Sequence, residues 1–426
     1  MKRFRLPRFQ TFAAFGATIF LSSCGGTTNT MPPGPTAESR PLAMSTASAS
    51  YEVIYPFSGG LDGGNAATEL VFDPQGNAYG TTVQGGNAGC GTVFRLHPTT
   101  IGHWRESVLY NFSCFSDGKN PHGGVVRDAQ GNLYGTTVAG GLSGGCTGDG
   151  CGVIFKIAAG GGESVLYTFQ GKNDGFGPGS PLAFDASGNL YGTAPDGGKF
   201  GDGTVFTLKS MSGVWVFEAI HQFTGGNDGS TGSLGPLFVD AHGAVFGVAE
   251  LGGAHQSGVA YEMKRVNGSW TFAPIYAFKG QPDAAFPYGG LIEIGETLYG
   301  TTCFGGTTGN GSVYELTPGT TSCSERVLYS FKGGNDGSFP TSTLMAGPAG
   351  RLLYGTTSMG GGASCDCGTV FSVARGAMTE SALHRFGALH DGQNPYYGLT
   401  QFGSSLYSST VAGGTSGNGT IFSITP

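Results

Sequence analysis

One aspartate recurs in seven short Gly-rich stretches along the chain of 426 residues, and repeated carboxylates are the first candidates for chemistry. These residues are Asp62, Asp117, Asp174, Asp228, Asp283, Asp336 and Asp391. A ring of carboxylates would attract cations or accept hydrogen bonds from a polyhydroxy ligand. An aspartate in a Gly-rich loop also closes its own turn. Because a binding site needs departures from a repeat, the presence of this residue in every stretch favours the turn.

Two histidines break the pattern and are better candidates for ligand binding. His122 and His390 lie in equivalent loops, with Asp117 and Asp391 nearby. Imidazole and carboxylate groups together suit several transition metals. The spacing of these residues matches no known metal signature and no EF-hand loop. We therefore predict no metal site and no other cofactor.

Aromatic and catalytic patterns give weaker signals. Tyr396 and Tyr397 follow Pro395, and they predict either a platform that stacks on a sugar or packing at the base of a loop. The chain contains no Walker-type phosphate loop and no His-Glu-x-x-His pair. Catalysis in a repeat protein could still assemble from residues that are far apart in the sequence, so the missing motifs disfavour an enzyme without excluding one.

Four cysteines predict two disulfides. Cys90 lies just before one expected strand and Cys114 just after its antiparallel neighbour, so the two ends meet. Cys146 and Cys151 bracket a single loop and could pair with each other. Disulfides of this kind belong to an oxidising compartment.

A second group of four cysteines has no unique pairing. Cys303 and Cys323 are expected at opposite ends of their unit, farther apart than the roughly 7 Å between α-carbons that a bridge allows. Cys365 and Cys367 lie in a loop of the next unit, on the side of Cys303. A link from Cys303 to that loop stays open.

All of these residues must be positioned by a repeated element. The stretch from Gly131 to Thr137 has close relatives along the whole chain, at intervals of 53 to 57 residues. Its aromatic anchors are Tyr79, Tyr134, Tyr191, Phe246, Tyr299, Tyr354 and Tyr407. A regular period of this kind indicates an array of identical supersecondary units, and hence one large repeat domain over residues 51–426.

Each unit contains four short apolar runs bounded by Gly, Asp, Asn or Pro, which is typical of strands. In the second unit the runs are 123–128, 132–137, 152–157 and 164–169. The domain opens at 51–57 with a fourth strand and closes at 419–424 with a third strand, so the two incomplete ends together make one unit.

We therefore predict an all-β fold, a seven-bladed β-propeller of four-stranded antiparallel blades in which the N-terminal strand completes the C-terminal blade. The phenylalanine that ends each fourth strand would form the core between blades. Loops between blades, and loops between second and third strands, would emerge on one face, which we call the long-loop face. The glycine inside each second strand would mark the close approach of another backbone.

The repeat resembles a known family. Its signature is Asn132-Leu133-Tyr134-Gly135-Thr136-Thr137, then a Gly-Gly loop, then Gly91-Thr92-Val93-Phe94 or its equivalents, then Val108-Leu109-Tyr110 with Phe112. This pattern resembles the Gloeo/Verruco (GloVer) tandem repeat of bacterial surface proteins, over residues 51–426. The resemblance implies a propeller-like secreted protein, and it brings no established activity or site residues.

The N-terminus predicts export. Residues 1–23 have a basic start, an apolar stretch and small residues before Cys24, which indicates a signal peptide. Leu21-Ser22-Ser23-Cys24 resembles a bacterial lipobox, so we expect Cys24 to carry a lipid. Residues 24–50 would form a flexible Ser/Thr/Pro-rich tether. Without the signal segment, 17 basic side chains face 28 acidic ones, which argues against nucleic acid as a partner.

The sequence thus favours a lipid-anchored module of the bacterial cell envelope, at the outer membrane or the cell surface. We expect a monomeric domain that binds or scaffolds an envelope protein or glycan without catalysis and touches the membrane only through its lipid. Two alternatives stay open. One is a secreted polysaccharide lyase or hydrolase that uses acidic residues on the long-loop face, and the other is a purely structural surface module.

Overall fold

Strands make up nearly all of the regular structure in the computed structural model. It describes residues 49–100, 102–141, 145–146, 148–232, 235–320, 322–362 and 365–426. The expected signal peptide, Cys24 and nearly all of the expected tether lie outside these residues. The two helical segments described are short 3-10 turns, η1 (Gly334–Asp336) and η2 (Pro348–Gly350). A search of the described part of the chain for a helix long and apolar enough to cross a membrane finds none.

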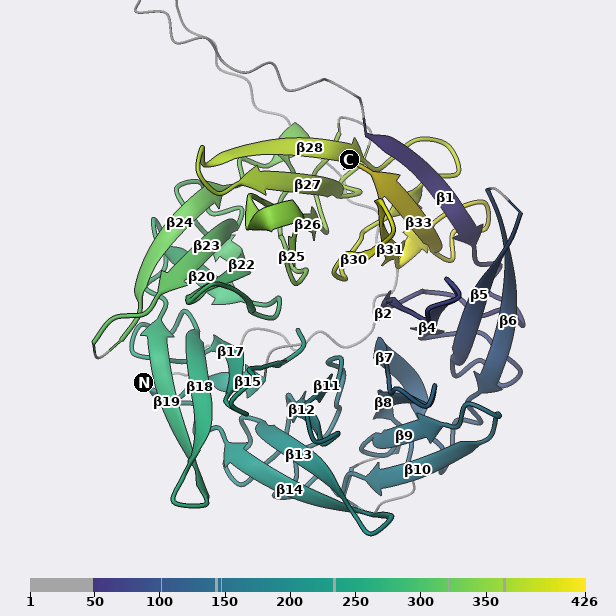
Figure 1. The fold of residues 1–426 in the computed structure, drawn as a ribbon, viewed down its shortest axis with the longest axis horizontal. Helices are drawn as coiled ribbons and strands as arrows, with labels where there is room; N and C mark the ends of the chain where they lie inside the picture. The colour runs from purple at the N-terminus through teal and green to yellow at the C-terminus, as the bar shows by residue number, and fades with distance from the viewer. Residues whose placement is uncertain are drawn as a thin grey trace, which may run out of the picture. The chain divides into compact units, whose positions relative to one another are not determined.

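Seven sheets surround a central axis and form the blades of a propeller (Figure 1). Blade 1 contains β3 (Val71–Phe72), β4 (Ala78–Thr82), β5 (Thr92–Thr100) and β6 (His103–Asn111), and blade 2 contains β7 (Lys119–Arg127), β8 (Leu133–Ala139), β9 (Val153–Ile157) and β10 (Glu163–Thr168). Blade 3 contains β11 (Ala183–Phe184), β12 (Leu190–Ala194), β13 (Thr204–Met211) and β14 (Val214–Gln222). Blade 4 contains β15 (Ser230–Gly232), β16 (Phe238–Val239), β17 (Val245–Leu251), β18 (Val259–Val266) and β19 (Ser269–Ala277).

Blade 5 contains β20 (Ala284–Pro287), β21 (Ile292–Ile294), β22 (Thr297–Gly305), β23 (Ser312–Thr317) and β24 (Ser324–Ser330), and blade 6 contains β25 (Met345–Ala346), β26 (Leu352–Thr357), β27 (Thr369–Ala374) and β28 (Thr379–Arg385). Blade 7 contains β30 (Thr400–Phe402), β31 (Ser405–Thr410), β33 (Thr420–Thr425) and β1 (Ser50–Pro56). Short pieces lie beside the blades, namely β2 (Thr68–Glu69), β29 (Gly392–Gln393) and β32 (Ala412–Gly413). The predicted seven-bladed fold is confirmed.

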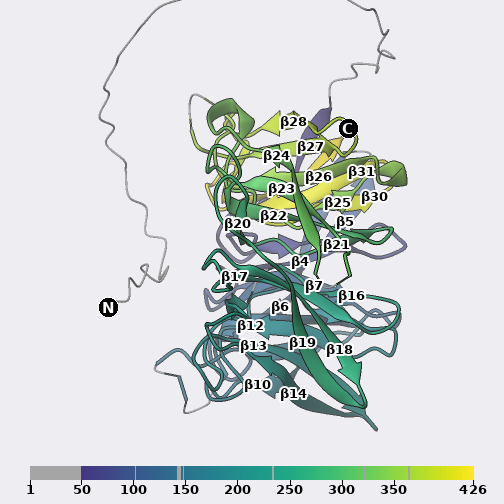
Figure 2. The same ribbon diagram turned by 90° about the vertical axis from the view of Figure 1, so that its left-hand side faces the viewer.

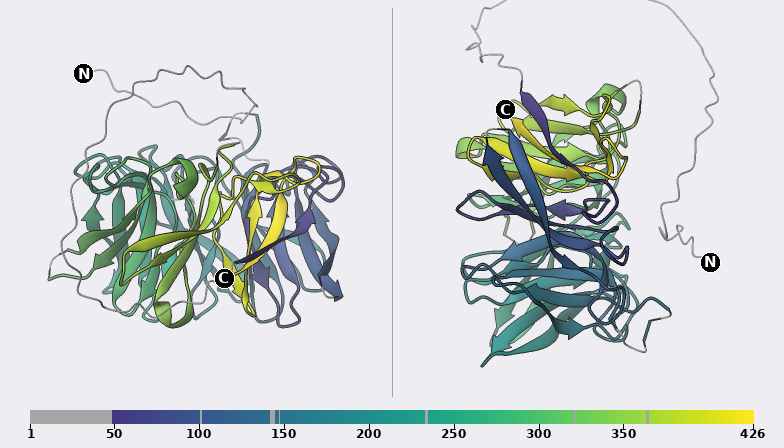
Figure 3. Two further views of the ribbon diagram at one scale, coloured as in Figure 1. Left: turned by 90° about the horizontal axis from the view of Figure 1, so that it is seen from above. Right: turned by 90° about the vertical axis from the view of Figure 1, so that its right-hand side faces the viewer.

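The two ends of the propeller close the ring by pairing with each other. β1 runs antiparallel to β33, with Tyr51 opposite Ile424 and Pro56 opposite Thr420. Figure 3 shows the purple β1 beside the yellow β33, and Figure 2 shows the ring from its side. Within each blade the strand that comes first after the preceding blade is innermost and the fourth is outermost, as predicted.

Phenylalanines that follow the outermost strands link the blades into one core. Each of these seven residues is at most 2% exposed, and each packs on an aromatic ring in the third strand of the next blade. Phe57 contacts Phe94 at 5.2 Å between ring centroids, and Phe386 contacts Phe422 at 5.3 Å. These two contacts join blade 7 to both of its neighbours, so the aromatic ring is continuous across the point of closure.

The glycine inside the second strand, present in blades 1 to 6, has a different nearest neighbour from the predicted backbone. A Cβ on Gly135 would lie 2.6 Å from the Phe155 ring of its own blade, and 2.9 Å from the Gly124 carbonyl oxygen. On Gly300 it would lie 2.4 Å from the Tyr314 hydroxyl. The nearest neighbour is therefore an aromatic side chain of the third strand, and the neighbouring backbone comes second.

Three disulfides are present among the described residues. Cys90 pairs with Cys114, and Cys146 pairs with Cys151, as predicted. Cys365 pairs with Cys367. The link from Cys303 to this loop, which the sequence left open, is therefore not formed, because the two loop cysteines satisfy each other. Cys303 is a buried thiol, and it is not joined to Cys323.

Candidate functional site

The seven loop aspartates close their own loops. Each carboxylate pairs with the side chain seven residues earlier, on the outermost strand, and accepts the backbone N–H four residues earlier. The side-chain partners are Tyr55 (3.1 Å), Tyr110 (2.9 Å), Tyr167 (2.9 Å), His221 (3.1 Å), Tyr276 (2.7 Å), Tyr329 (2.7 Å) and His384 (2.9 Å).

This arrangement keeps the carboxylates at the outer strands, away from the axis. At Asp117, burial alone would raise the pKa, but hydrogen bonds from Ser113 and Tyr110 outweigh burial and lower it. The aspartate is therefore ionised at neutral pH, and its lone pairs are largely occupied. The geometry agrees with the turn interpretation of these residues, because each carboxylate is bonded within its own loop.

The two histidines are not brought together. His390 is exposed, and its backbone has a φ of 65°. His122 lies on β7 at the inner edge of blade 2, and its Nδ1 shares a 2.9 Å hydrogen bond with the Tyr397 hydroxyl. Within the described residues no group of three or more His, Cys, Asp or Glu side chains is arranged to hold a metal ion.

The innermost segment of each blade carries the clearest departures from the repeat. Each segment ends in a buried Leu or Val, and the residue three positions earlier lies beside the axis. In the six blades where it is described, that residue is Ala67, His122, Gly179, Tyr288, Thr341 or Tyr396. The histidine and the two tyrosines of this set, together with Glu69, Glu250 and Tyr397, form what we call the channel cluster: Glu69, His122, Glu250, Tyr288, Tyr396 and Tyr397.

One side of the channel cluster is built around Tyr397. Its hydroxyl contacts His122, and the charge of Glu69 adds to burial in raising its pKa. Burial raises the pKa of Glu69 itself to about 7, although hydrogen bonds from the Gly398 N–H and the Thr343 side chain oppose the rise. Burial lowers the pKa of His122 to about 4. At neutral pH this side therefore holds a neutral imidazole, a neutral phenol and a carboxyl group with a pKa near that pH.

The other side of the channel cluster is built around Tyr288. Burial raises its pKa well above the usual value, and the charges of Cys303, Glu250, Tyr397 and Tyr396 add to the rise. These groups therefore face one another, although Tyr288 belongs to blade 5 and the other two tyrosines to blade 7. Burial raises the pKa of Glu250 to about 7 as well. None of the six members of the cluster is a permanent cation.

Hydroxyl groups of the neighbouring strands fix the Tyr397 segment. The Ser408 side chain donates to the carbonyl oxygens of Tyr397 (3.2 Å) and Gly398 (2.9 Å). Thr356 of blade 6 also donates to the Tyr397 carbonyl at 3.2 Å. Ser408 stands where the other blades have glycine in the second strand, so this departure from the repeat holds the segment that carries Tyr396 and Tyr397.

A cavity of about 320 Å³ adjoins Glu69. Its walls come from the inner strands of blades 1 and 2 and from Pro181, Leu182 and Pro236 of the next two blades. Arg127 also lines it. Glu69 is thus partly accessible to solvent, and a ligand that enters this cavity meets one carboxyl group against mostly apolar walls.

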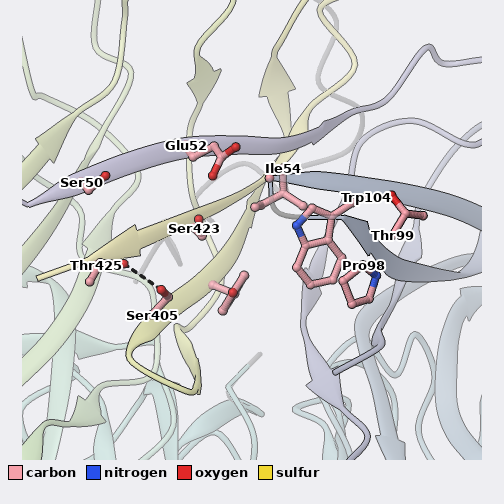
Figure 4. Close-up of a pocket in the computed structure, with 11 residues that line it drawn as sticks. Ser50, Glu52, Ile54, Pro98, Thr99, Trp104, Ser405, Ser423 and Thr425 are labelled. Carbon is pink, nitrogen blue, oxygen red and sulfur yellow. Dashed lines mark hydrogen bonds between the residues drawn. The ribbon is translucent and has the colours of Figure 1, made fainter. Parts of the chain in front are cut away.

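A second cavity, of about 430 Å³, lies between blades 7 and 1, where the ring closes (Figure 4). Trp104 and Tyr407 provide its aromatic surface, with ring centroids 6.1 Å apart. The same contact recurs between Trp215 and Tyr134, and again between Trp270 and Tyr191. Because it recurs, the aromatic pair is packing between blades, and we regard the channel cluster as the stronger candidate.

The channel cluster can bind and exchange protons. Tyrosine rings stack on sugar faces, and hydroxyl, imidazole and carboxyl groups exchange hydrogen bonds with a hydroxyl-rich ligand. Of its six members, the sequence predicted His122, Tyr396 and Tyr397, and it missed Glu69, Glu250 and Tyr288. Aligning the units on the buried Leu or Val, and reading the three residues before it, would have identified Glu69 and Tyr288.

Known structures share the fold at low sequence identity. An oligogalacturonate lyase from Vibrio parahaemolyticus has a TM-score of 0.53 at 13% identity, over 89% of this chain and 94% of that one. A fungal alcohol oxidase of the AA5 family in complex with copper has a TM-score of 0.53 at 12% identity, over 89% and 76%. The extracellular domain of a putative hybrid two component system from B. thetaiotaomicron has a TM-score of 0.52 at 12% identity, over 88% and 42%. These likenesses concern the propeller alone.

Sequence comparison gives a family. No curated protein matches the chain. A model described as the Gloeobacter/Verrucomicrobia repeat matches residues 42–147, 105–302 and 234–426, which together span the whole propeller. The resemblance read from the repeat signature is confirmed, and the chain belongs to the Gloeobacter/Verrucomicrobia repeat family.

Proposed function

We propose that the protein is an extracellular binding module of the bacterial cell envelope, held there by a lipid on Cys24, and that its channel cluster binds an uncharged, hydroxyl-rich ligand such as the end of a glycan. The observation that carries this proposal is the concentration of non-repeated polar and aromatic residues beside the axis. Elsewhere in the innermost segments the same position holds small residues, Ala67 and Gly179, or a threonine, Thr341.

The charge of the channel cluster supports an uncharged ligand. Two carboxyl groups with pKa values of about 7 become anionic as pH rises, and the cluster supplies no permanent cation to balance a ligand anion. An acidic sugar would meet repulsion above pH 7. A neutral sugar would stack on Tyr288, Tyr396 or Tyr397 and exchange hydrogen bonds with Glu69.

Glycan-array binding tests the proposal. The full chain is applied to the array, and the affinity for any glycan retained is measured by titration calorimetry. We expect Tyr396→Ala to weaken binding at least tenfold. Phe200→Ala removes an aromatic ring that is 52% exposed in a loop between second and third strands of blade 3, away from the axis, and should leave the affinity unchanged. Absence of binding to any glycan, or equal loss in both variants, would contradict the proposal.

The acid–base character of Glu69 favours an enzyme as the second candidate. A carboxyl group with a pKa of about 7 can donate and accept protons at neutral pH, and a neutral His122 lies on the same side of the cluster. A lyase or hydrolase would use these groups in preference to the loop aspartates, which are engaged in closing their loops. Turnover on a polysaccharide panel that is abolished by Glu69→Gln would establish this candidate, and the absence of any turnover would leave the binding role alone.

A further inference from the structure

The position six residues before each core phenylalanine faces the blade before it. In blades 1 to 7 it is occupied by Glu106, Glu163, Phe217, Phe272, Glu325, Glu380 and Tyr51. Phe217 stacks on Tyr167 at 4.1 Å between centroids, and Phe272 stacks on His221 at 4.0 Å. Tyr167 and His221 are the partners of loop aspartates in the preceding blades. At these two contacts between neighbouring blades, which we call seams, an aromatic ring therefore covers the side chain that holds the loop aspartate.

The four glutamates meet the equivalent loop aspartates of other blades with a carboxyl group. One oxygen of each glutamate, Oε1, is fully buried and has no hydrogen-bond partner. Glu325 lies within hydrogen-bonding reach of Asp283, and Glu380 within reach of Asp336. Glu106 and Glu163 lie close enough to Asp62 and Asp117, respectively, to feel their charge. An ionised carboxylate can only accept hydrogen bonds, so two carboxylates cannot satisfy each other.

Other charged and titratable groups surround the two closest pairs. Around Glu325 these are Tyr276 of the preceding blade, Tyr314 of its own sheet, and Lys279. Around Glu380 they are Tyr329, Arg385 and Lys332. The three cations favour the ionised glutamates, yet none of them bonds to the unpaired oxygens. Protonation lets Glu325 and Glu380 donate a hydrogen bond to the aspartate beside them.

We propose that four of the seven seams between blades are fastened by protons: protonated Glu325 and Glu380 donate a hydrogen bond to Asp283 and Asp336, and protonation of Glu106 and Glu163 removes their repulsion from Asp62 and Asp117. The proton comes from solvent and returns to it, and no other bond changes. The ring is therefore tightest in mild acid, and these four seams loosen as the glutamates ionise. The remaining three seams, sealed by Phe217, Phe272 and Tyr51, carry no glutamate at this position.

The sign of the effect follows from linkage. Burial, and then the neighbouring aspartate, raises the pKa of Glu106, Glu163 and Glu380 to about 7 and that of Glu325 to about 9. An unfolded chain has a glutamate pKa of about 4.3, so the folded protein holds more protons between these values. The contribution of these glutamates to stability is full below about pH 4.3 and is lost as pH rises through 7, and for Glu325 through 9.

A fourfold variant tests the proposal on the full chain. Glu106→Gln, Glu163→Gln, Glu325→Gln and Glu380→Gln together replace the carboxyl groups by amides of the same shape that donate at every pH. For the wild type we expect the unfolding equilibrium constant to rise between pH 5 and pH 8 by on the order of tenfold per glutamate, allowing for solvent screening of half-buried groups. In the fourfold variant most of this rise should vanish. Ionisation of Glu69 and Glu250 also lowers stability as pH rises. The test therefore rests on the difference in slope between the fourfold variant and the wild type, and not on the wild-type slope alone.

Two controls complete the test. Glu293→Gln with Glu296→Gln alters two exposed glutamates and should keep the full wild-type slope. Carboxyl titration by NMR of wild-type protein labelled with ¹³C-glutamate gives an independent answer if the fourfold variant does not fold. Six glutamate signals should titrate near pH 7 or above, four from the seam glutamates and two from Glu69 and Glu250. A fourfold variant with the wild-type slope, or glutamate signals that all titrate near pH 4.5, would overturn the proposal.

Discussion

Asp117 illustrates how a residue that repeats in every unit is used for structure. Its carboxylate accepts hydrogen bonds from the Ser113 N–H (2.7 Å), the Ser113 hydroxyl and the Tyr110 hydroxyl (2.9 Å). Its side chain is buried at 8% exposure, so these donors have no ready replacement from water. A ligand would have to compete with all three.

Asp117→Ala should therefore destabilise the protein by about 1–3 kcal/mol, because it leaves buried donors without a partner. Urea unfolding at pH 7 measures the change. Asp366→Ala, at an exposed aspartate, is the matched control and should change stability by less than about 0.5 kcal/mol. Ligand binding should be the same in both variants. A variant of Asp117 that keeps its stability but loses the ligand would return the loop aspartates to the list of binding residues.

Glu69 should make the stability of the protein depend on pH. Its folded pKa of about 7 lies above the unfolded value, so its contribution is full in acid and is lost as pH rises through 7. At pH 5 the Glu69→Gln variant should be no more stable than the wild type. At pH 8 its stability relative to the wild type should be higher than at pH 5. Thermal unfolding at the two pH values measures the difference. A gain of the same size at both pH values would show that Glu69 does not titrate in this range.

At the scale of the element, the second strand of blades 1 to 6 depends on one glycine beneath an aromatic ring. Gly135→Ala would place a Cβ 2.6 Å from the Phe155 ring, so the ring must move. We expect a loss of about 1–3 kcal/mol from overpacking. Gly160→Ala is the control, because no atom lies within 4 Å of the added Cβ. The midpoints of denaturant unfolding compare the two variants. Equal shifts of the midpoint would show that Gly135 is not tightly packed against the Phe155 ring.

The strands themselves could be predicted from the sequence, because their apolar runs are bounded by turn residues in every unit. The second strand of blade 2, predicted at 132–137, is observed as β8 (Leu133–Ala139). The neighbour of Gly135 could not be predicted, because strand periodicity does not say which side chain of the third strand crosses the sheet. The Cys365–Cys367 pair was missed for a similar reason, since its loop conformation is not coded by spacing.

The candidate site was predicted only in part. Tyr396, Tyr397 and His122 stood out because they differ from their counterparts in the repeat. Glu69 and Glu250 follow ordinary strand signals, and only the ring closure brings Glu69 toward Tyr397. The geometry of closure decides which distant segments meet, and no local pattern specifies it.

At the scale of the whole molecule, closure places a buried core phenylalanine at every contact between neighbouring blades. Phe57 joins blade 7 to blade 1 near the N-terminal end of the propeller, and Phe169 joins blades 3 and 2 in its interior, with each ring completely buried. In a closed ring Phe57→Ala and Phe169→Ala should each cost about 3–5 kcal/mol. In an open array Phe57 would lie at a frayed end, and Phe57→Ala would destabilise the protein far less. Urea unfolding of the two variants distinguishes the cases.

The claim that the ligand lies beside the axis is tested most directly by amide hydrogen exchange of the full chain with and without a bound glycan. We predict slower exchange in the inner segments 66–70, 121–125, 287–291 and 395–399, because these carry or adjoin the channel cluster. Protection confined to the loops of the seven aspartates, or to the cavity around Trp104 between blades 7 and 1, would contradict the account.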